Sequence, residues 1–160
     1  MSGGYGDYSH ASNVTGTGQT FLHGYLIIHV KEARNLPDME MWLSKLYDNK
    51  DVTDPFVDVK LGKARIAKSA VIDNSLNPQW NEWFKVEVCH RADSLIFDVR
   101  DKDHANTEVI GIVEISTQHL LNGQVVEGWF PITNTSNKVR YDLISNVSIE
   151  RDEKITRKNK

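Results

Sequence analysis

Apolar and polar residues alternate along several short segments of the chain, beginning after Phe21. The alternation is clearest in VDVKL (57–61) and FKVEV (84–88), where every second residue is apolar. Such alternation is typical of a strand with one face on a core and the other in water. Similar segments, rich in β-branched and aromatic residues, occur at 25–33, 55–61, 65–72, 83–90, 94–101, 109–116 and 128–132. This spacing predicts an all-β protein built as a β-sandwich.

The remaining stretches define the limits of the folded domain. STQHLLNG (116–123) predicts one short helical turn, TNTSNKVRYD (133–142) a loop, and LISNVSIE (143–150) a last strand. Residues 1–20 are rich in Gly, Ser and Tyr and predict a flexible tail, because they offer little apolar surface to bury. Residues 151–160 predict a solvated, charged tail, so we expect a single domain over residues 21–150.

Composition narrows the classes of function. The chain has 160 residues, 39% of them hydrophobic, and a formal net charge of −3. This is enough for a core, and it lacks the strong positive charge that nucleic-acid-binding proteins carry. The single cysteine, Cys89, excludes an internal disulfide, and its place in a strand pattern predicts a buried thiol. With no signal-peptide pattern and no apolar run of about 20 residues, we expect a soluble, cytoplasmic protein.

Acidic residues gather where two pairs of predicted strands are joined. One loop carries Asp38, Glu40 and Asp54, and the other carries Asp101, Asp103 and Glu108. Loops at the same end of a sandwich lie side by side, so we expect these carboxylates to converge. Their mutual repulsion favours a bound cation, and hard oxygen ligands without His or Cys favour Ca²⁺. The alternative is that these acids only solvate turns, which Asp favours in any protein.

Five segments in order resemble the C2 domain, the calcium- and lipid-binding module of protein kinase C and synaptotagmin. They are GYLIIHVKEARNLPDME, TDPFVDVKLG, NSLNPQWNEWFKVEV, FDVRDKD and EVIGIVEIS. The resemblance covers roughly residues 21–150. It is closest to the amino-terminal C2 domain of plant-type phospholipases D, through LHGYLIIHV, NLPDMEMW and VEISTQHLLNGQVVEGWFPI. It implies an eight-stranded antiparallel β-sandwich of type II topology, whose first strand leads into the first calcium loop.

The resemblance also implies which residues bind calcium. The five acidic positions of the family correspond here to Glu40, Asp54, Asp101, Asp103 and Glu108, and Asp38 is a possible substitute for Glu40. Glutamate stands at 40 and 108 where the family has aspartate, so we expect weak binding. Five carboxylates carry a charge of about −5, and two Ca²⁺ would reduce it to about −1. This predicts an electrostatic switch that lets the loops approach an anionic bilayer.

Two further groups of residues suggest lipid contact. Met39, Met41, Trp42 and Leu43 lie beside the expected ligands, and we expect them to insert into the bilayer. The alternative is a short helix packed on the sandwich. Lys60, Lys63, Arg65 and Lys68 surround one hairpin, where the family carries a polybasic phosphoinositide site. Not all of these residues fall on the same face of their strands if the alternation is regular. The alternative to a lipid-binding site is that the charges only solvate the hairpin.

No catalytic constellation is present in the sequence. His29-Val30-Lys31 matches the start of the phospholipase D catalytic motif, but Leu36 stands where its aspartate should be. We therefore expect a membrane-targeting module and not an enzyme, and the resemblance implies the regulatory module of a phospholipase D-like protein or a stand-alone relative. The expected cofactor is Ca²⁺, and the expected partner is an anionic phospholipid membrane to which the protein is recruited. We expect the protein to be a monomer. The alternative is a calcium-independent module that binds protein or phosphoinositide and has a degenerate metal site.

Overall fold

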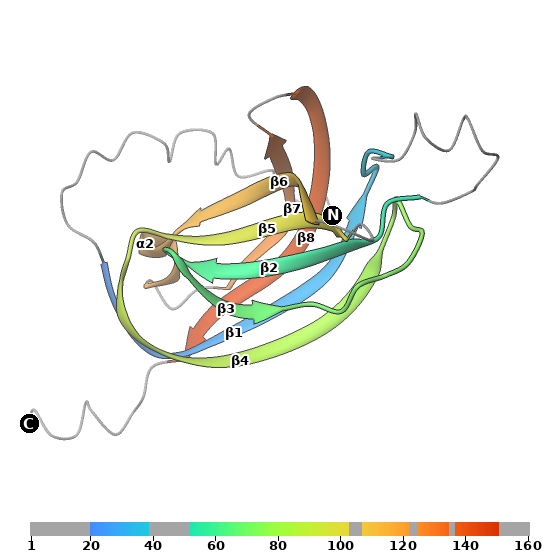
Figure 1. Cartoon of the computed structure of the whole chain (residues 1–160). Coiled ribbons are helices and arrows are strands. Elements are labelled where there is room, and N and C mark those ends of the chain that lie inside the picture. The colour runs from blue at the N-terminus through green and yellow to red at the C-terminus, as the bar shows by residue number, and fades with distance from the viewer. Residues whose placement is uncertain (1–19, 39–51, 103–106, 122–124, 135–136, 151–160) are drawn as a thin grey trace, which may run out of the picture.

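The computed structural model describes residues 20–38, 52–102, 107–121, 125–134 and 137–150. Eight strands and one helical turn make up this part of the chain (Figure 1). The strands are β1 (Thr20–Arg34), β2 (Pro55–Leu61), β3 (Ala64–Lys68), β4 (Gln79–Ala92), β5 (Ser94–Lys102), β6 (Thr107–Ser116), β7 (Val126–Asn134) and β8 (Asn137–Glu150), and the turn is α2 (Thr117–Leu120). No helix among these residues is long and apolar enough to cross a bilayer.

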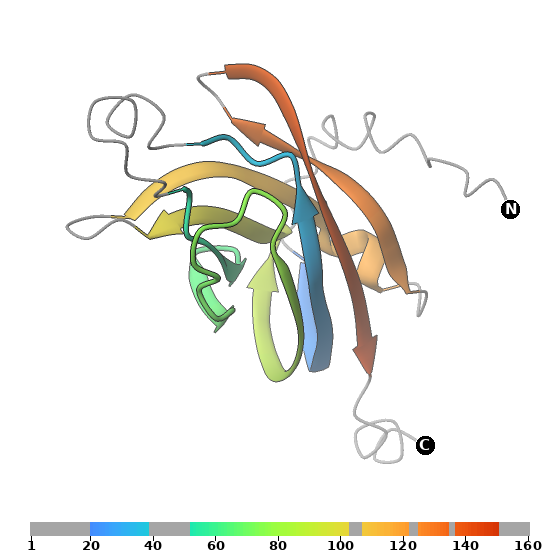
Figure 2. The same cartoon turned by 90° about the vertical axis from the view of Figure 1, so that its right-hand side faces the viewer.

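The strands form two antiparallel layers. Sheet A has the order β7-β8-β1-β4, and sheet B has the order β3-β2-β5-β6. The two layers are connected where β6 pairs with β7 through a single pair of residues, Ile112 and Thr133. Figure 2 shows the two layers from the end where β2 begins. The eight-stranded sandwich of type II topology is therefore confirmed, with β1 at the centre of sheet A between β8 and β4.

Apolar and polar residues alternate along the strands, and the apolar side chains on the inner faces form the core. Leu26, Ile28 and Val30 of β1 are fully buried, and so are Val57 and Val59 of β2. Each such side chain stabilises the fold by roughly 1.5–3 kcal/mol when it leaves water. The residues between them point to the outer faces, so the position of each polar side chain follows from its parity.

Gly111 marks the place where the two layers come together. A Cβ added to Gly111 would lie 2.6 Å from Cγ2 of Ile132 and 2.9 Å from the carbonyl oxygen of Thr133. Both contacts are too close for any side chain, so glycine allows β6 to approach β7 at the strand pair that joins the sheets.

Three predictions of local structure were wrong. The loop predicted at 133–142 is largely strand, because β7 continues to Asn134 and β8 begins at Asn137, where the two residues pair. The segment predicted as a strand over 65–72 ends at Lys68. Cys89 is exposed, because its parity on β4 is that of the outward residues, whereas its neighbour Val88 is buried.

Candidate calcium and lipid site

Acidic residues from two distant loops meet at one end of the sandwich. The backbone N–H of Asp54 donates a 2.7 Å hydrogen bond to Oδ1 of Asp101, although 47 positions separate them in the chain. The backbone N–H of Lys102 donates in return to the carbonyl oxygen of Asp54 at 3.0 Å. Asp54 immediately precedes β2 and Asp101 lies near the end of β5, and these strands pair antiparallel, so both residues lie at the same end of the sandwich (Figure 1).

A third loop braces the carboxylate of Asp54. The backbone N–H of Asn74 donates to Oδ1 of Asp54 at 2.7 Å, and the side chain of Asn74 accepts from the N–H of Val52 at 2.9 Å. Asn74 has a φ of +53°, a left-handed conformation that asparagine tolerates better than most residues. A carboxylate that accepts one N–H still has lone pairs that can bind a cation. The hydrogen bond from Asn74 therefore fixes the position of the Asp54 carboxylate and leaves it able to act as a ligand.

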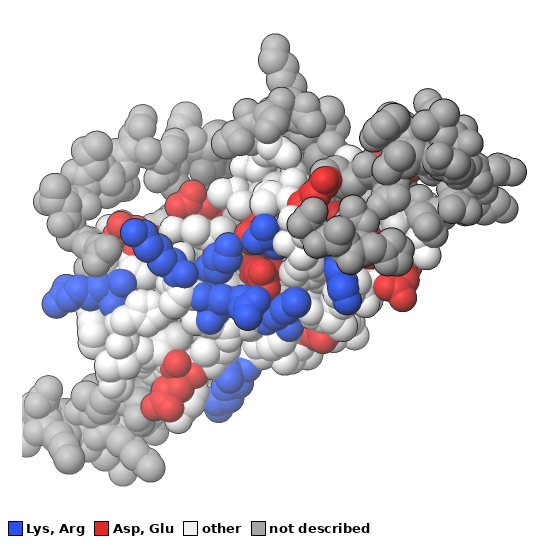
Figure 3. Space-filling view, in the orientation of Figure 1, with Lys and Arg blue, Asp and Glu red and all other residues white. Residues whose placement is uncertain are grey.

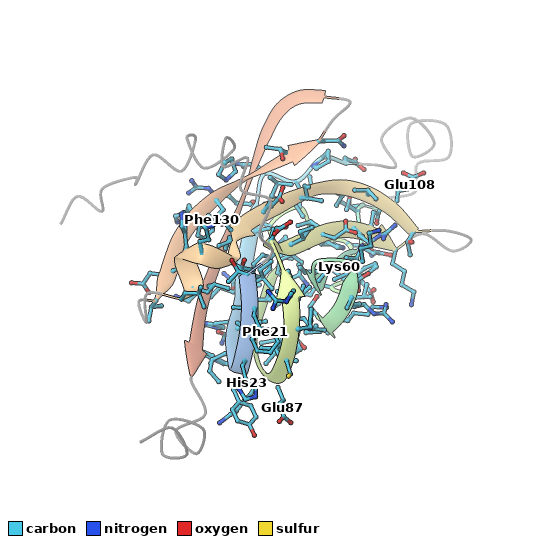
Figure 4. All side chains as sticks on the ribbon, turned by 90° about the vertical axis from the view of Figure 1, so that its left-hand side faces the viewer. Phe21, His23, Lys60, Glu87, Glu108 and Phe130 are labelled. Carbon is cyan, nitrogen blue, oxygen red and sulfur yellow. The ribbon has the colours of Figure 1, made fainter. Side chains whose placement is uncertain are left out.

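Glu108 and Asp38 are the other predicted acidic ligands that the structure describes. Glu108 is the direct cross-strand partner of Asp101 and is exposed, and Figure 4 shows its side chain pointing away from the sandwich. Asp38 is half-buried, and its neighbour Pro37 accepts a 2.6 Å hydrogen bond from the hydroxyl of Thr53. Both acids thus lie on segments that lead directly to the Asp54–Asp101 pair. Like charges opposite each other destabilise a strand pair, which a bound cation would relieve.

The other predicted residues of the tip lie outside the described part of the chain. These are Glu40, Asp103 and the four predicted membrane-inserting residues Met39, Met41, Trp42 and Leu43. Within the described residues, no group of three or more His, Cys, Asp or Glu side chains converges closely enough to hold a metal. Asp54 and Asp101, which the backbone N–H of Asp54 joins, carry hard oxygen donors of the kind Ca²⁺ prefers, so their chemistry fits part of a calcium ligand set.

The four basic residues of the predicted polybasic site surround the β2–β3 hairpin, as expected. A register shift between Val59 and Lys60 resolves the conflict of their parities, because Asp58 then pairs with Lys68, and Lys60 with Arg65. A β-bulge therefore brings Arg65 and Lys68 to the outer face of sheet B. Lys63 is exposed on the turn between the two strands. Figure 3 shows Lys and Arg side chains gathered over this face, with acidic atoms between them.

Two buried aspartates hold this basic face together. Asp58 and Asp98 are direct cross-strand partners and are only 6% and 5% exposed. Asp98 Oδ2 accepts from Lys60 Nζ at 2.8 Å and from Arg100 at 3.3 Å, and Arg65 lies 3.6 Å from Oδ1 of Asp58. Lys68 lies over the ring of Phe56, 4.7 Å from its centroid.

The aspartates and Arg100 were not predicted as part of this face. The sequence does carry a signal, because the triplet Asp-Val-cation occurs twice, at 58–60 and at 98–100. In a strand each triplet places its acid and its base on one face, so the two strands can share their charges. The six charged side chains with these contacts carry a net charge of +2, because four are basic and two are acidic: Lys60, Arg65, Lys68, Arg100, Asp58 and Asp98.

The tryptophans of NPQWNEW have different environments. Trp80 is 7% exposed, packs against the core and donates from its indole nitrogen to the carbonyl oxygen of Pro55 at 3.3 Å. Trp83 is 63% exposed on the outer face of sheet A, where it stacks on His29.

The two four-stranded sheets and their strand order define an eight-stranded antiparallel β-sandwich with predicted acidic residues at one end. A sequence profile described as the C2 domain matches residues 24–132, and the chain belongs to this family. A C2 domain is a non-catalytic module, and no catalytic domain is evident in the part of the chain that is described.

Curated relatives point to phospholipases D. The chain is 38% identical to phospholipase D gamma 2 of Arabidopsis thaliana over 136 residues, which cover 73% of this chain and 16% of that protein. It is 35% identical to C2 domain-containing protein 5 of Xenopus tropicalis, over 81% of this chain and 13% of that protein. The chain thus spans less than a fifth of the length of either relative.

Solved structures agree on the fold. A C2 domain of plant extended synaptotagmin 1 superposes with a TM-score of 0.65 at 25% identity, covering 81% of this chain and 95% of that chain. The calcium-bound pair of C2 domains of extended synaptotagmin 2 gives a TM-score of 0.66 at 24% identity, over 82% of this chain and 47% of that chain.

Proposed function

We propose that this chain is a calcium-dependent membrane-targeting module that binds anionic phospholipid through its acidic tip. The observation that carries the proposal is the hydrogen bond between Asp54 and Asp101, which fixes acids of two loops in one place. Glu40 and Asp103 are the remaining proposed ligands, with Glu108 and Asp38 on the adjoining segments. Converging carboxylates without a cation repel each other and an anionic surface, and Ca²⁺ removes both effects.

The residues of the tip have distinct roles in this mechanism. Asp54 is held by the amide of Asn74, and Asp101 by the amide of Asp54, so both carboxylates are positioned before an ion arrives. When bound, Ca²⁺ supplies positive charge and coordination sites for lipid phosphate oxygens. Met39, Met41, Trp42 and Leu43 are proposed to add apolar contact with the bilayer. The change is local charge neutralisation and needs no refolding of the sandwich.

A second, calcium-independent mode of binding is favoured by the basic face of sheet B. Lys60, Arg65 and Lys68 lie on one face because of the bulge, and Lys63 extends it at the turn. Each basic residue near an anionic membrane contributes about 1 kcal/mol. Asp58 and Asp98 reduce this attraction, so we propose that the face supports the tip with phosphoinositide contacts and does not replace it.

Because the relatives are much longer than this chain, we also propose that the module regulates a phospholipase D-like protein. The direct test of the proposed function is sedimentation of the 160-residue chain with phosphatidylserine vesicles, in Ca²⁺ and in EGTA. We expect the chain in the pellet with Ca²⁺ and in the supernatant with EGTA. Equal binding in both conditions would reject the calcium mechanism in favour of the basic face.

A further inference from the structure

Strand β4 forms an open edge of the sandwich. It is the last strand in the order of the sheets, is 14 residues long and pairs with β1. Figure 1 shows it along the lower border of the molecule. An edge strand presents a row of backbone donors and acceptors that can pair with a further strand, and most proteins protect long edges of this kind.

The two open edges of the sandwich differ in their protection. β3, at the other end of the order, has only five residues and a register shift in its pairing with β2. Short length and bulges are common ways to prevent edge pairing. β4 pairs with β1 in one register from Ala92 to Glu82 without a shift, and it contains no proline. The middle of β4 therefore lacks the protection that β3 has.

The inward side chains of β4 also leave the edge open. Phe84 and Val86 are partly buried against the core, and Val88 is 3% exposed. An inward-pointing charge would obstruct a neighbouring strand, but these three central residues are apolar. Glu82 has the same parity at the end of this register, and its carboxylate accepts a 2.9 Å hydrogen bond from the backbone N–H of Ala70. An added strand would cover the parts of Phe84 and Val86 that still contact water, which is favourable.

The outward side chains of β4 have a charge pattern that is complementary to that of a second, antiparallel copy of β4. They are Trp83, Lys85, Glu87 and Cys89, in an alternating row. A two-fold axis through Val86 places Lys85 of one copy opposite Glu87 of the other, and this pair occurs twice. An axis through Lys85 or through Glu87 would instead place like charges opposite each other, which is unfavourable.

The outward row is already ordered by β1. The ring of Trp83 stacks on His29 with centroids 3.9 Å apart, and Lys85 lies over Tyr25, 4.8 Å from its centroid. Figure 4 shows Glu87 pointing outward where β1 and β4 border the molecule. Side chains that are fixed before association lose less entropy on binding.

We propose that β4 pairs antiparallel with β4 of a second copy of this chain about Val86, which extends sheet A across a symmetric homodimer. This differs from the monomer expected from the sequence. Antiparallel pairing directs the two acidic tips toward opposite ends of the dimer. If the proposed calcium-dependent lipid binding also holds, on which this consequence depends, the dimer joins two membranes and does not dock twice on one.

The test is a charge exchange measured by analytical ultracentrifugation over a roughly hundredfold range of concentration. Lys85→Glu and Glu87→Lys each place two like-charged pairs at the interface and should weaken dimerisation by about tenfold or more. Mixing the two variants restores both opposite pairs, so a heterodimer should form with near wild-type affinity. Glu114→Lys, the same change at an exposed position of β6, is the matched control and should dimerise normally.

Each outcome decides one claim. A wild-type chain that stays monomeric, single variants that still dimerise, or a mixture that does not recover would overturn the β4 dimer. Circular dichroism of each variant confirms that it is folded. Vesicle clustering in Ca²⁺, followed by turbidity, tests the membrane bridge. Binding without clustering by the dimeric chain would overturn the bridge, whereas failure to bind vesicles would overturn the proposed function and leave the dimer result standing.

Discussion

Asp58 and Asp98 lie directly opposite each other on β2 and β5, and both are buried under basic side chains. Two carboxylates in this relation repel, so Lys60, Arg65 and Arg100 act as their counter-ions. The same cations form the surface that would face anionic lipid. The stability of sheet B and the lipid attraction of its outer face are therefore coupled.

Asp98→Asn should strengthen calcium-independent binding to anionic vesicles. The substitution removes the charge that holds Lys60 and Arg100, which adds one positive charge to the face. At about 1 kcal/mol per charge near the membrane, we expect about a fivefold gain in affinity in EGTA, measured by vesicle sedimentation. Asp93→Asn, the same change at an exposed position, is the control. A gain no larger than that of Asp93→Asn would show that Asp98 does not restrain the face.

Two substitutions at Asp101 should separate its structural role from its charge. Asparagine keeps an oxygen that can accept the N–H of Asp54, whereas alanine removes it. In EGTA, Asp101→Ala should lose about 1–3 kcal/mol of unfolding free energy, and Asp101→Asn should lose little because its repulsion with Glu108 is also relieved. Urea unfolding measures both. Equal losses would show that the hydrogen bond does not stabilise the tip.

Calcium-stimulated lipid binding should disappear in the double variant Asp101→Asn with Asp103→Asn. Both substitutions remove proposed ligand charge while the size of each side chain is kept. Vesicle sedimentation with Ca²⁺ measures the effect, and the thermal unfolding midpoint confirms the fold. Unchanged binding by this variant would reject the ligand assignment.

Trp42→Ala should weaken association with the bilayer and leave Ca²⁺ affinity unchanged without lipid. Full burial of such a side chain is worth roughly 1.5–3 kcal/mol and less at an interface, so we expect up to about a tenfold loss. Trp83→Ala removes an exposed tryptophan from the outer face of sheet A and serves as the control. Equal lipid affinity of Trp42→Ala and wild type would favour a packed helix in this loop.

Gly111→Ala should destabilise the connection between the sheets. The new methyl group would overlap Ile132 and the backbone of Thr133, which forces β6 and β7 apart. Overpacking of this kind costs typically about 1–3 kcal/mol, measurable by urea unfolding. A variant as stable as the wild type would show that the close approach is not required.

The strand pattern was predictable because parity is a local property. The alternation in 57–61 and 84–88 correctly assigned inward and outward residues, and Asp54 and Asp101 were expected to meet because their loops flank paired strands. Cys89 was predicted to be buried from its place in a strand pattern, but the alternation of 84–88, continued by one residue, places it outside with Lys85 and Glu87.

The arrangement of the basic face could not be predicted in the same way. A bulge changes parity, and it depends on how β3 pairs with β2 and not on either strand alone. The role of Asn74 was also not predicted, because Asn74 lies in the connection between β3 and β4, where no strand pairing indicates that it contacts Asp54. The prediction of a loop at 133–142 failed because polar residues beside a hairpin turn can still pair as strands, as Asn134 does with Asn137.

Calorimetric titration of Ca²⁺ into the chain without lipid tests the convergence of the acids most directly. Wild type should bind with a saturable heat, and Asp54→Asn and Asp101→Asn, which come from different loops, should each weaken binding by at least about tenfold. Absence of saturable heat in the wild type, or full affinity in either variant, would contradict a shared calcium site at this tip.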